Sequence, residues 1–193
     1  MPSVSGPYGL VPAFHPNGLV RPVQIRLTKA LMEATPTLFH DQPVALDPTG
    51  RLAQAANAAD WCGVFYGVEY QDLTGRPIVQ NTWTNGVLVR DLGNDSARVY
   101  FTRDPEIVYK IQASAAMGFD DIGEQAAFLN IANGNTTTGL SSASLDQSTV
   151  SSAQNMMKVH NIDPSPFNDW TDNFPDIQVQ IARHQEVAAK AGF

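Results

Sequence analysis

The chain has 193 residues and a formal net charge of −7, and 43% of its residues are hydrophobic, which is enough for a folded core. Its 12 basic residues are scattered singly, so no basic stripe could follow a phosphate backbone, and we do not expect nucleic-acid binding. No apolar run approaches the length of a membrane span and no secretory signal opens the sequence. We therefore expect folding in the cytoplasm, without a membrane partner.

The overall composition favours short elements over long surface helices. Only 16% of the residues are charged, whereas 13 are proline and 14 are glycine. Such a composition is typical of many short strands joined by turns. We therefore predict a β-rich protein with under about a fifth of its residues in helices, against roughly a third in an average globular protein.

Residues 1–22 are predicted to form an extended N-terminal arm. Prolines stand at positions 2, 7, 12, 16 and 22, a density that excludes a helix and does not fit a central strand. The segment also carries apolar side chains that need a surface to cover them. Two interpretations stay open, because the arm can pack along its own domain or lie on another subunit. For the second interpretation the candidate interface residues are Tyr8, Leu10, Phe14 and Leu19.

The next part of the chain predicts two short strands. Residues 23–28 alternate between apolar and polar side chains, as a half-buried strand does. Residues 43–46 form a second apolar strand, which a turn with proline and glycine at residues 47–50 ends. Residues 29–34 fit either a helical turn or more strand. Residues 51–59 are alanine-rich and favour a short helix, which would be marginal in isolation.

A β-hairpin over residues 61–86 is the clearest local prediction. Residues 61–70 alternate in a period of two, and their β-branched and aromatic side chains favour a strand. Residues 71–75 read as a turn, and Pro77 is expected at the start of the returning strand, where a missing N–H is tolerated. One face of the first strand carries Cys62, Val64, Tyr66, Val68 and Tyr70.

Two features of this hairpin lead to further expectations. Gly63 and Gly67 leave gaps on the opposite face, where a neighbouring backbone or an aromatic ring could lie close. Cys62 is the only cysteine, so it cannot form an internal disulfide. Because it shares a face with apolar residues, we predict that it is buried and inert.

The remainder of the chain predicts further strands and no long helix. The loop at residues 133–139 is too polar and glycine-rich for the core, and residues 141–152 are dominated by serine and threonine. With the earlier segments the strands number about nine or ten, which points to an all-β barrel or sandwich. The strand predictions cover residues 86–90, 97–102, 106–113, 128–132, 154–162 and 177–184.

No residue pattern in the sequence indicates catalysis or metal binding. The four histidines show no ligand spacing, and Asp120-Asp121 lacks the alternating oxygen ligands of a calcium loop. The serines include no nucleophile elbow. The loop at residues 134–139 lacks the lysine of a phosphate-binding loop. We therefore expect no catalytic residues, no metal and no cofactor.

Several segments in order resemble the capsid decoration (cement) proteins of tailed bacteriophages. The resemblance touches most of the chain between residues 60 and 185. It is carried by residues 63–70 (GVFYGVEY) with the turn 74–77 (TGRP), residues 103–112 (RDPEIVYKIQ), residues 134–141 (GNTTTGLS) followed by Leu145-Asp146, and the closing residues 181–184 (IARH).

The resemblance implies a jelly-roll-like β-barrel or sandwich that binds the outside of a bacteriophage capsid shell. Such a virion protein bridges neighbouring major capsid (coat) protein subunits as a symmetric homo-oligomer, a dimer or a trimer, without catalysis. The expected division is an arm at residues 1–22, a β-domain at residues 23–186 and a short tail at residues 187–193. The alternative is a carbohydrate-binding β-sandwich that stacks sugars on Trp61, Trp83 and Trp170.

Overall fold

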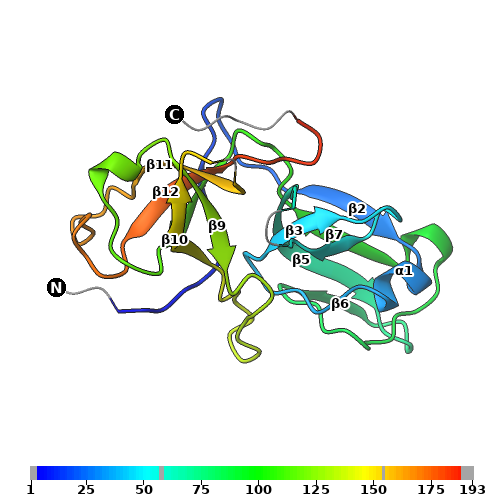
Figure 1. Ribbon diagram of the computed structural model, residues 1–193. Helices are drawn as coiled ribbons and strands as arrows, with labels where there is room; N and C mark the ends of the chain where they lie inside the picture. The colour runs from blue at the N-terminus through cyan, green and yellow to red at the C-terminus, as the bar shows by residue number, and fades with distance from the viewer. Residues whose placement is uncertain (1–3, 57–58, 154, 188–193) are drawn as a thin grey trace.

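The computed structural model of the chain describes residues 4–56, 59–153 and 155–187. Strands account for 41% of the chain and helices for 6%, which confirms the prediction of an all-β protein. Two antiparallel sheets of six strands each pack together as a β-sandwich and occupy the left and right halves of Figure 1.

The first sheet joins strands from both ends of the chain. Its order is β1-β8-β12-β11-β9-β10, so the N-terminal strand β1 lies at one edge and pairs with β8. The strands are β1 (Val11–Phe14), β8 (Val108–Gln112), β9 (Gln125–Leu129), β10 (Ser144–Ser151), β11 (Met157–Ile162) and β12 (Asp176–Ile181).

The second sheet is built from the first half of the chain. Its order is β2-β7-β5-β3-β4, with β6 paired to β5. The strands are β2 (Val23–Leu27), β3 (Pro43–Leu46), β4 (Leu52–Gln54), β5 (Gly63–Gln71), β6 (Pro77–Gln80) and β7 (Ala97–Phe101). The helical elements are α1 (Lys29–Glu33) and the 3-10 turns η1 (Gly93–Asp95) and η2 (Phe119–Asp121).

Helix α1 settles the segment for which the sequence left two alternatives. The side chain of Thr28 caps the helix by accepting a hydrogen bond from the Leu31 N–H, which is the usual role of threonine at a helix start. Met32 is fully buried on its inner side. The single turn is therefore held by its cap and by packing, because five residues are too few for a stable isolated helix.

Each sheet covers its own hydrophobic core cluster. In the first cluster Trp61 packs edge-on against Phe128, with ring centroids 5.1 Å apart. In the second cluster Trp83 packs perpendicular to Tyr70 at 5.6 Å. Both indole N–H groups donate to backbone carbonyls, so these buried tryptophans leave no unsatisfied donor.

Strand β5 connects the two clusters, and its alternation is broken by a bulge. Val64 belongs to the first cluster, whereas Phe65 belongs to the second. The pairing with β7 shifts between Phe65 and Gly67, which turns Tyr66 out to solvent while Val68 stays buried. The prediction that Tyr66 and Val68 share one buried face is therefore wrong, because the sequence alternation could not reveal the extra residue.

The two glycines of β5 do face neighbouring backbone, as predicted. A Cβ on Gly63 would lie 1.6 Å from the Thr102 carbonyl oxygen, and a Cβ on Gly67 would lie 2.9 Å from that of Gln80. The turn of the hairpin is also confirmed. Asp72 accepts hydrogen bonds from the backbone of Thr74 and Arg76 in this turn, and Pro77 begins β6.

Two other local predictions need correction, and one segment for which no element was predicted forms a strand. Within residues 51–59 the structure places the strand β4, because Leu52 pairs with Leu46 of β3 and is buried. Residues 86–90 form no strand, and the Val89 N–H donates instead to the Glu33 carboxylate. The serine-rich residues 144–151 form β10, with Leu145 as the core anchor. Of the predicted tail, residues 188–193 lie outside the described residues.

The N-terminal segment is part of the β-domain, and a free arm is not confirmed. Leu10 is fully buried in the first core cluster, and its N–H donates to the Asp41 carbonyl at 2.8 Å. The Gly9 N–H donates to the Ala143 carbonyl. Tyr8 donates its hydroxyl proton to the Asp176 carboxylate at 2.8 Å. No structural boundary therefore separates residues 4–14 from the rest of the first sheet.

Cys62 is fully buried in the second core cluster, which confirms its predicted placement. Its thiol donates to the Val44 carbonyl, and burial raises the pKa of the thiol to about 12. Because only the thiolate reacts, we expect labelling of the native protein at pH 8 to be at least about tenfold slower than labelling in denaturant. Time-resolved mass spectrometry with iodoacetamide measures both rates. Equal rates would contradict this burial.

Candidate functional site

The surface where the two sheets meet carries three neighbouring hollows. The His15 hollow, of about 540 Å³, lies beside Leu19, Arg21 and Val23. The Asp41 hollow, of about 300 Å³, is lined by Val11, Pro12, Val20, Pro22, His40, Asp41, Tyr66 and Thr102. The Tyr66 hollow, of about 460 Å³, is lined by Pro22, His40, Tyr66, Gly67, Val68, Val79, Gln80, Asn81 and Tyr100.

These hollows adjoin one another around a ridge at residues 19–23, and we name this region the interaction surface for the role proposed below. Alternate ridge residues line the His15 hollow and the Asp41 hollow, so the ridge is the wall between them. The Asp41 and Tyr66 hollows share Pro22, His40 and Tyr66, and we call these two together the furrow. Strands of both sheets and the ridge thus supply its walls.

Large apolar side chains are exposed along this interaction surface. Leu19 on the ridge is 78% exposed, and Val79 beside the Tyr66 hollow is 77% exposed. Tyr66 is half exposed at the bottom of the furrow. Exposed large apolar side chains that gather in one region are a feature of protein–protein interaction sites.

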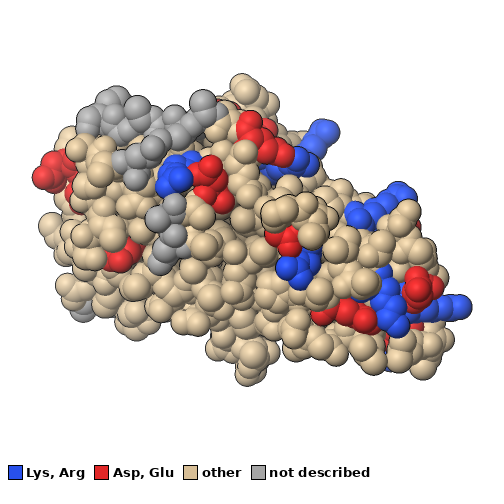
Figure 2. All heavy atoms as spheres, turned by 45° about the vertical axis from the view of Figure 1, so that its right-hand side comes forward, with Lys and Arg blue, Asp and Glu red and all other residues tan. Residues whose placement is uncertain are grey.

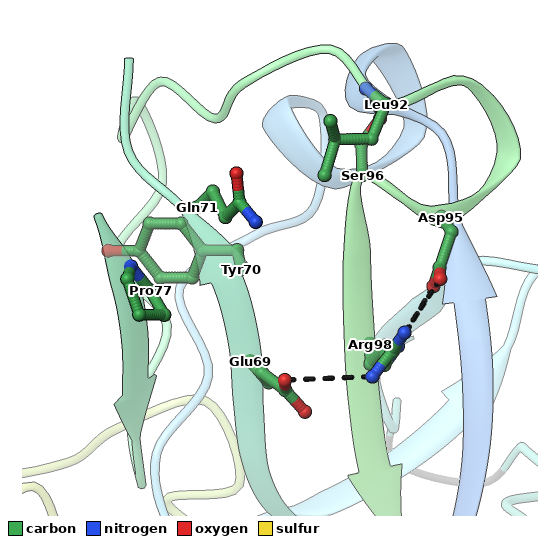
Figure 3. A pocket seen from close by; sticks show the side chains of 8 residues that line it. All are labelled: Glu69, Tyr70, Gln71, Pro77, Leu92, Asp95, Ser96 and Arg98. Carbon is green, nitrogen blue, oxygen red and sulfur yellow. Dashed lines mark hydrogen bonds and ion pairs between the residues drawn. The ribbon is translucent and has the colours of Figure 1, made fainter. Parts of the chain in front are cut away.

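Charged side chains on the face shown in Figure 2 are more numerous over its right-hand half, although acidic and basic groups also lie on its left-hand half. On the outer face of the second sheet Arg98 bonds Asp95 at 2.8 Å and lies 3.6 Å from Glu69, as Figure 3 shows. The hydrogen bonds from Arg98 hold the pKa of Asp95 below its usual range. The charges of Arg98, Asp95 and Glu69 thus pair with one another on an exposed face, where ion pairs contribute little to stability.

Asp41 is the most unusual residue of the furrow. Its backbone adopts a left-handed conformation with φ of 60°, which is uncommon outside glycine. Its N–H donates to the Phe65 carbonyl and its carbonyl accepts from Leu10, so three segments fix this conformation. The residue is only 6% exposed, and burial raises the pKa of its carboxyl group to about 6. Strained backbone and a shifted pKa are both typical of functional positions.

His40 is the one ion-pair partner of the Asp41 carboxylate within the described residues. Its Nδ1 lies 2.8 Å from the Tyr66 carbonyl oxygen, which can only accept, so Nδ1 carries a proton. Its Nε2 lies 3.6 Å from Asp41 Oδ2. Burial in the furrow favours the protonated form of the Asp41 carboxyl group, so the ionised form gains most from a second cationic or donor group beside it.

Replacing Asp41 by asparagine is expected to stabilise the protein at neutral pH and above. The raised pKa means that the folded state holds its proton up to about pH 6, whereas the unfolded chain releases it near 3.8. The folded state therefore loses stability as pH rises from about 4 to about 7, by roughly 3 kcal/mol at full ionisation. Asparagine also tolerates the left-handed conformation. We expect Asp41→Asn to gain about 1–3 kcal/mol at pH 8 and almost nothing at pH 4.

Urea denaturation of both proteins at the two pH values measures this difference. The control is Asp120→Asn, which removes an exposed carboxylate of the η2 turn and should change stability by less than about 0.5 kcal/mol at either pH. A gain for Asp41→Asn that is equal at pH 4 and pH 8 would show that ionisation of Asp41 is not its cause.

Of the four interface residues predicted from the sequence, two make contacts within the domain and two are exposed. Leu10 lies in the core and Tyr8 bonds to Asp176 of the same domain, so neither offers a free surface in this conformation. Phe14 is exposed on β1 and Leu19 on the ridge. A contact of these two residues with another subunit stays a prediction.

No sequence pattern indicated that His40, Asp41 or Tyr66 belongs to a site. The basic His40 and the acidic Asp41 are adjacent in sequence, and no motif distinguishes them from an ordinary surface pair. Their common feature is where the fold places them, at the junction of the two sheets. The tryptophan platform of the alternative interpretation is not formed, since Trp61 and Trp83 are fully buried while Trp170 packs on Phe119.

The described residues show no metal site and no membrane span. Among them, no three His, Cys, Asp or Glu side chains are grouped so that they could hold a metal ion. No helix in that part of the chain has both the length and the apolar character needed to cross a membrane. Comparisons of the chain with protein-family models, with curated proteins and with solved structures gave no match.

Proposed function

We propose that this chain is a structural protein of a bacteriophage virion that binds the outside of the capsid shell. In this role it stabilises the shell by bridging neighbouring major capsid protein subunits, and it acts as a symmetric homo-oligomer, a dimer or a trimer. The observation that supports the proposal best is the interaction surface, an exposed apolar region that joins both sheets and the N-terminal segment. The resemblance of residues 63–184 to capsid decoration proteins supports the same role.

The physical demands of this role agree with the features of the chain. A decoration protein needs a rigid domain and a surface for neighbours, and it needs no catalytic group. Each exposed apolar side chain that becomes buried contributes about 1.5–3 kcal/mol before ordering is subtracted. Many copies on one shell then add their contacts, so modest binding per copy is enough to resist heat or internal pressure.

The interaction surface also favours a protein partner over a sugar. Carbohydrate binding would require exposed aromatic rings for stacking, whereas two of the three tryptophans are in the cores. A carbohydrate-binding module therefore remains the second candidate, without a structural feature that favours it.

The test is to add the purified chain to particles of the encoding phage that lack it. We expect saturable co-sedimentation, a fixed number of copies per coat subunit, and a higher melting temperature of the particles. The double variant Leu19→Ser/Val79→Ser should bind at least about tenfold more weakly, because both residues are exposed on the interaction surface.

A matched control keeps the interpretation specific. Leu73 and Phe167 are also large, apolar and exposed, but they lie outside the interaction surface. The variant Leu73→Ser/Phe167→Ser should therefore bind particles like the wild type. Failure of the wild-type chain to bind such particles would contradict the proposed function. Equal binding by both double variants would show that the contact with the capsid lies outside this surface.

A further inference from the structure

We propose that the Asp41 hollow is an anchor site for an arginine side chain of the protein partner. The inference rests on the proposed function for the identity of that partner, which is the coat protein. The chemistry of the site follows from its lining residues alone. They combine one buried carboxylate with an aromatic ring and apolar walls.

The first argument is the incomplete pairing of the Asp41 carboxylate. It is more than nine-tenths buried and faces a hollow of about 300 Å³, which is room for about ten water molecules. Within the described part of the chain its ion-pair partner is His40, whose Nε2 lies 3.6 Å from Oδ2. Neither carboxylate oxygen is among the enclosed side-chain atoms that lack a hydrogen-bond partner, so the carboxylate is accessible from the hollow to a donor group of a partner.

The second argument is the shape of the remaining lining. Tyr66 supplies a half-exposed ring, and Val11, Pro12, Val20 and Pro22 supply apolar walls. A guanidinium group fits such a lining better than an ammonium group. It is planar, it stacks on aromatic faces, and it can donate two parallel hydrogen bonds to one carboxylate. Its aliphatic stem covers apolar surface at the same time.

The third argument is charge. The chain carries a net charge of −7, so its long-range field favours a partner with basic groups on the docking face. Among the residues that line the furrow His40 is the one basic side chain, and Arg21 of the ridge lines the His15 hollow instead. An arginine from outside would therefore complete the pairing that the chain leaves open.

Arginine binding at this site is coupled to pH through the Asp41 carboxyl group, whose pKa burial raises to about 6. A guanidinium group pairs with the ionised carboxylate, so its binding favours release of the Asp41 proton. The other titratable groups near the carboxylate are His40 beside it, Tyr66 in the hollow, and Tyr8, whose phenol pKa is raised chiefly by burial. Affinity for arginine should therefore rise as the pH is raised from 5 to 7.5.

The experiment uses the full chain and two small probes. Nα-acetyl-arginine amide and Nα-acetyl-citrulline amide have nearly the same shape, but only the first is charged. We titrate each into ¹⁵N-labelled protein and follow the backbone amide resonances by NMR. The expected result is saturable shifts at Asp41, Tyr66 and Gly67, with a Kd for the arginine probe at least about fivefold lower than that for the citrulline probe.

Two variants make the assignment specific. Asp41→Asn should lose the preference for arginine over citrulline and also its pH dependence. Asp104→Asn removes the carboxylate of the neighbouring His15 hollow and should keep both properties. If both probes bind the wild type equally, or Asp41→Asn retains the preference, or the shifts map elsewhere, the inference is overturned.

The outcome can be separated from that of the proposed function. If the chain binds capsids but shows no preference for arginine, the anchor site is contradicted and the structural role is supported. If it prefers arginine but does not bind capsids, the anchor site is supported and the role in the virion is contradicted.

Discussion

Replacing Leu10 by alanine is expected to lower the free energy of unfolding by about 2–5 kcal/mol, the range for a large side chain removed from a packed core. Leu10 is fully buried among the side chains of the first core cluster. Its N–H and that of Gly9 also bond to Asp41 and Ala143, so the segment is inserted between two other parts of the chain. Guanidinium denaturation measures the loss.

The control for this prediction lies in the same segment. Leu19 is 78% exposed, so Leu19→Ala should change stability by less than about 0.5 kcal/mol. If Leu10→Ala is equally harmless, residues 4–14 are an arm that detaches from the domain, as one interpretation of the sequence holds. A large loss at Leu10 alone identifies the segment as part of the fold.

Gly63→Ala is expected to be the most damaging single substitution, with a loss of more than about 4 kcal/mol or a failure to fold. The added Cβ would overlap the carbonyl of Thr102, at 1.6 Å from its oxygen and 2.6 Å from its carbon. Relief requires β5 to move away from the segment after β7. That movement breaks the hydrogen bonds between Val64 and Thr102 in both directions.

Soluble yield and denaturation of Gly63→Ala measure this effect. Gly6→Ala is the matched control, because a Cβ at Gly6 would meet no atom within 4 Å. We expect wild-type stability for this control, within about 0.5 kcal/mol. Wild-type stability of Gly63→Ala would contradict the close approach of β5 to Thr102, on which the junction of the two sheets depends.

The strands that the sequence predicted well are those whose pattern is local. Residues of β7 alternate between buried and partly exposed positions, β3 is a short apolar run, and the turn after β5 has its own cap in Asp72. β4 and β10 were missed because alanine and serine are weak strand formers. Their positions are determined by pairing with β3 and β9, which are tertiary contacts.

The candidate site could not be predicted, because no part of it is local. The Asp41 hollow draws its walls from residues near 11, 21, 40, 66 and 102 of the chain. Only the two-sheet arrangement brings them together. We predicted from residues 1–22 that an apolar segment contributes to an interface. This prediction still applies to Leu19, which is exposed on the ridge, but not to Leu10, which is buried in the core.

Hydrogen–deuterium exchange of the chain, free and bound to capsid shells, tests most directly whether the interaction surface contacts the coat protein. We predict slower exchange on binding at residues 11–23, 64–68 and 79–81, which contribute to the ridge and the furrow. Exchange of the exposed loop at residues 163–175 should not change. Protection confined to that loop or to residues 133–139, with none at the furrow, would contradict the account.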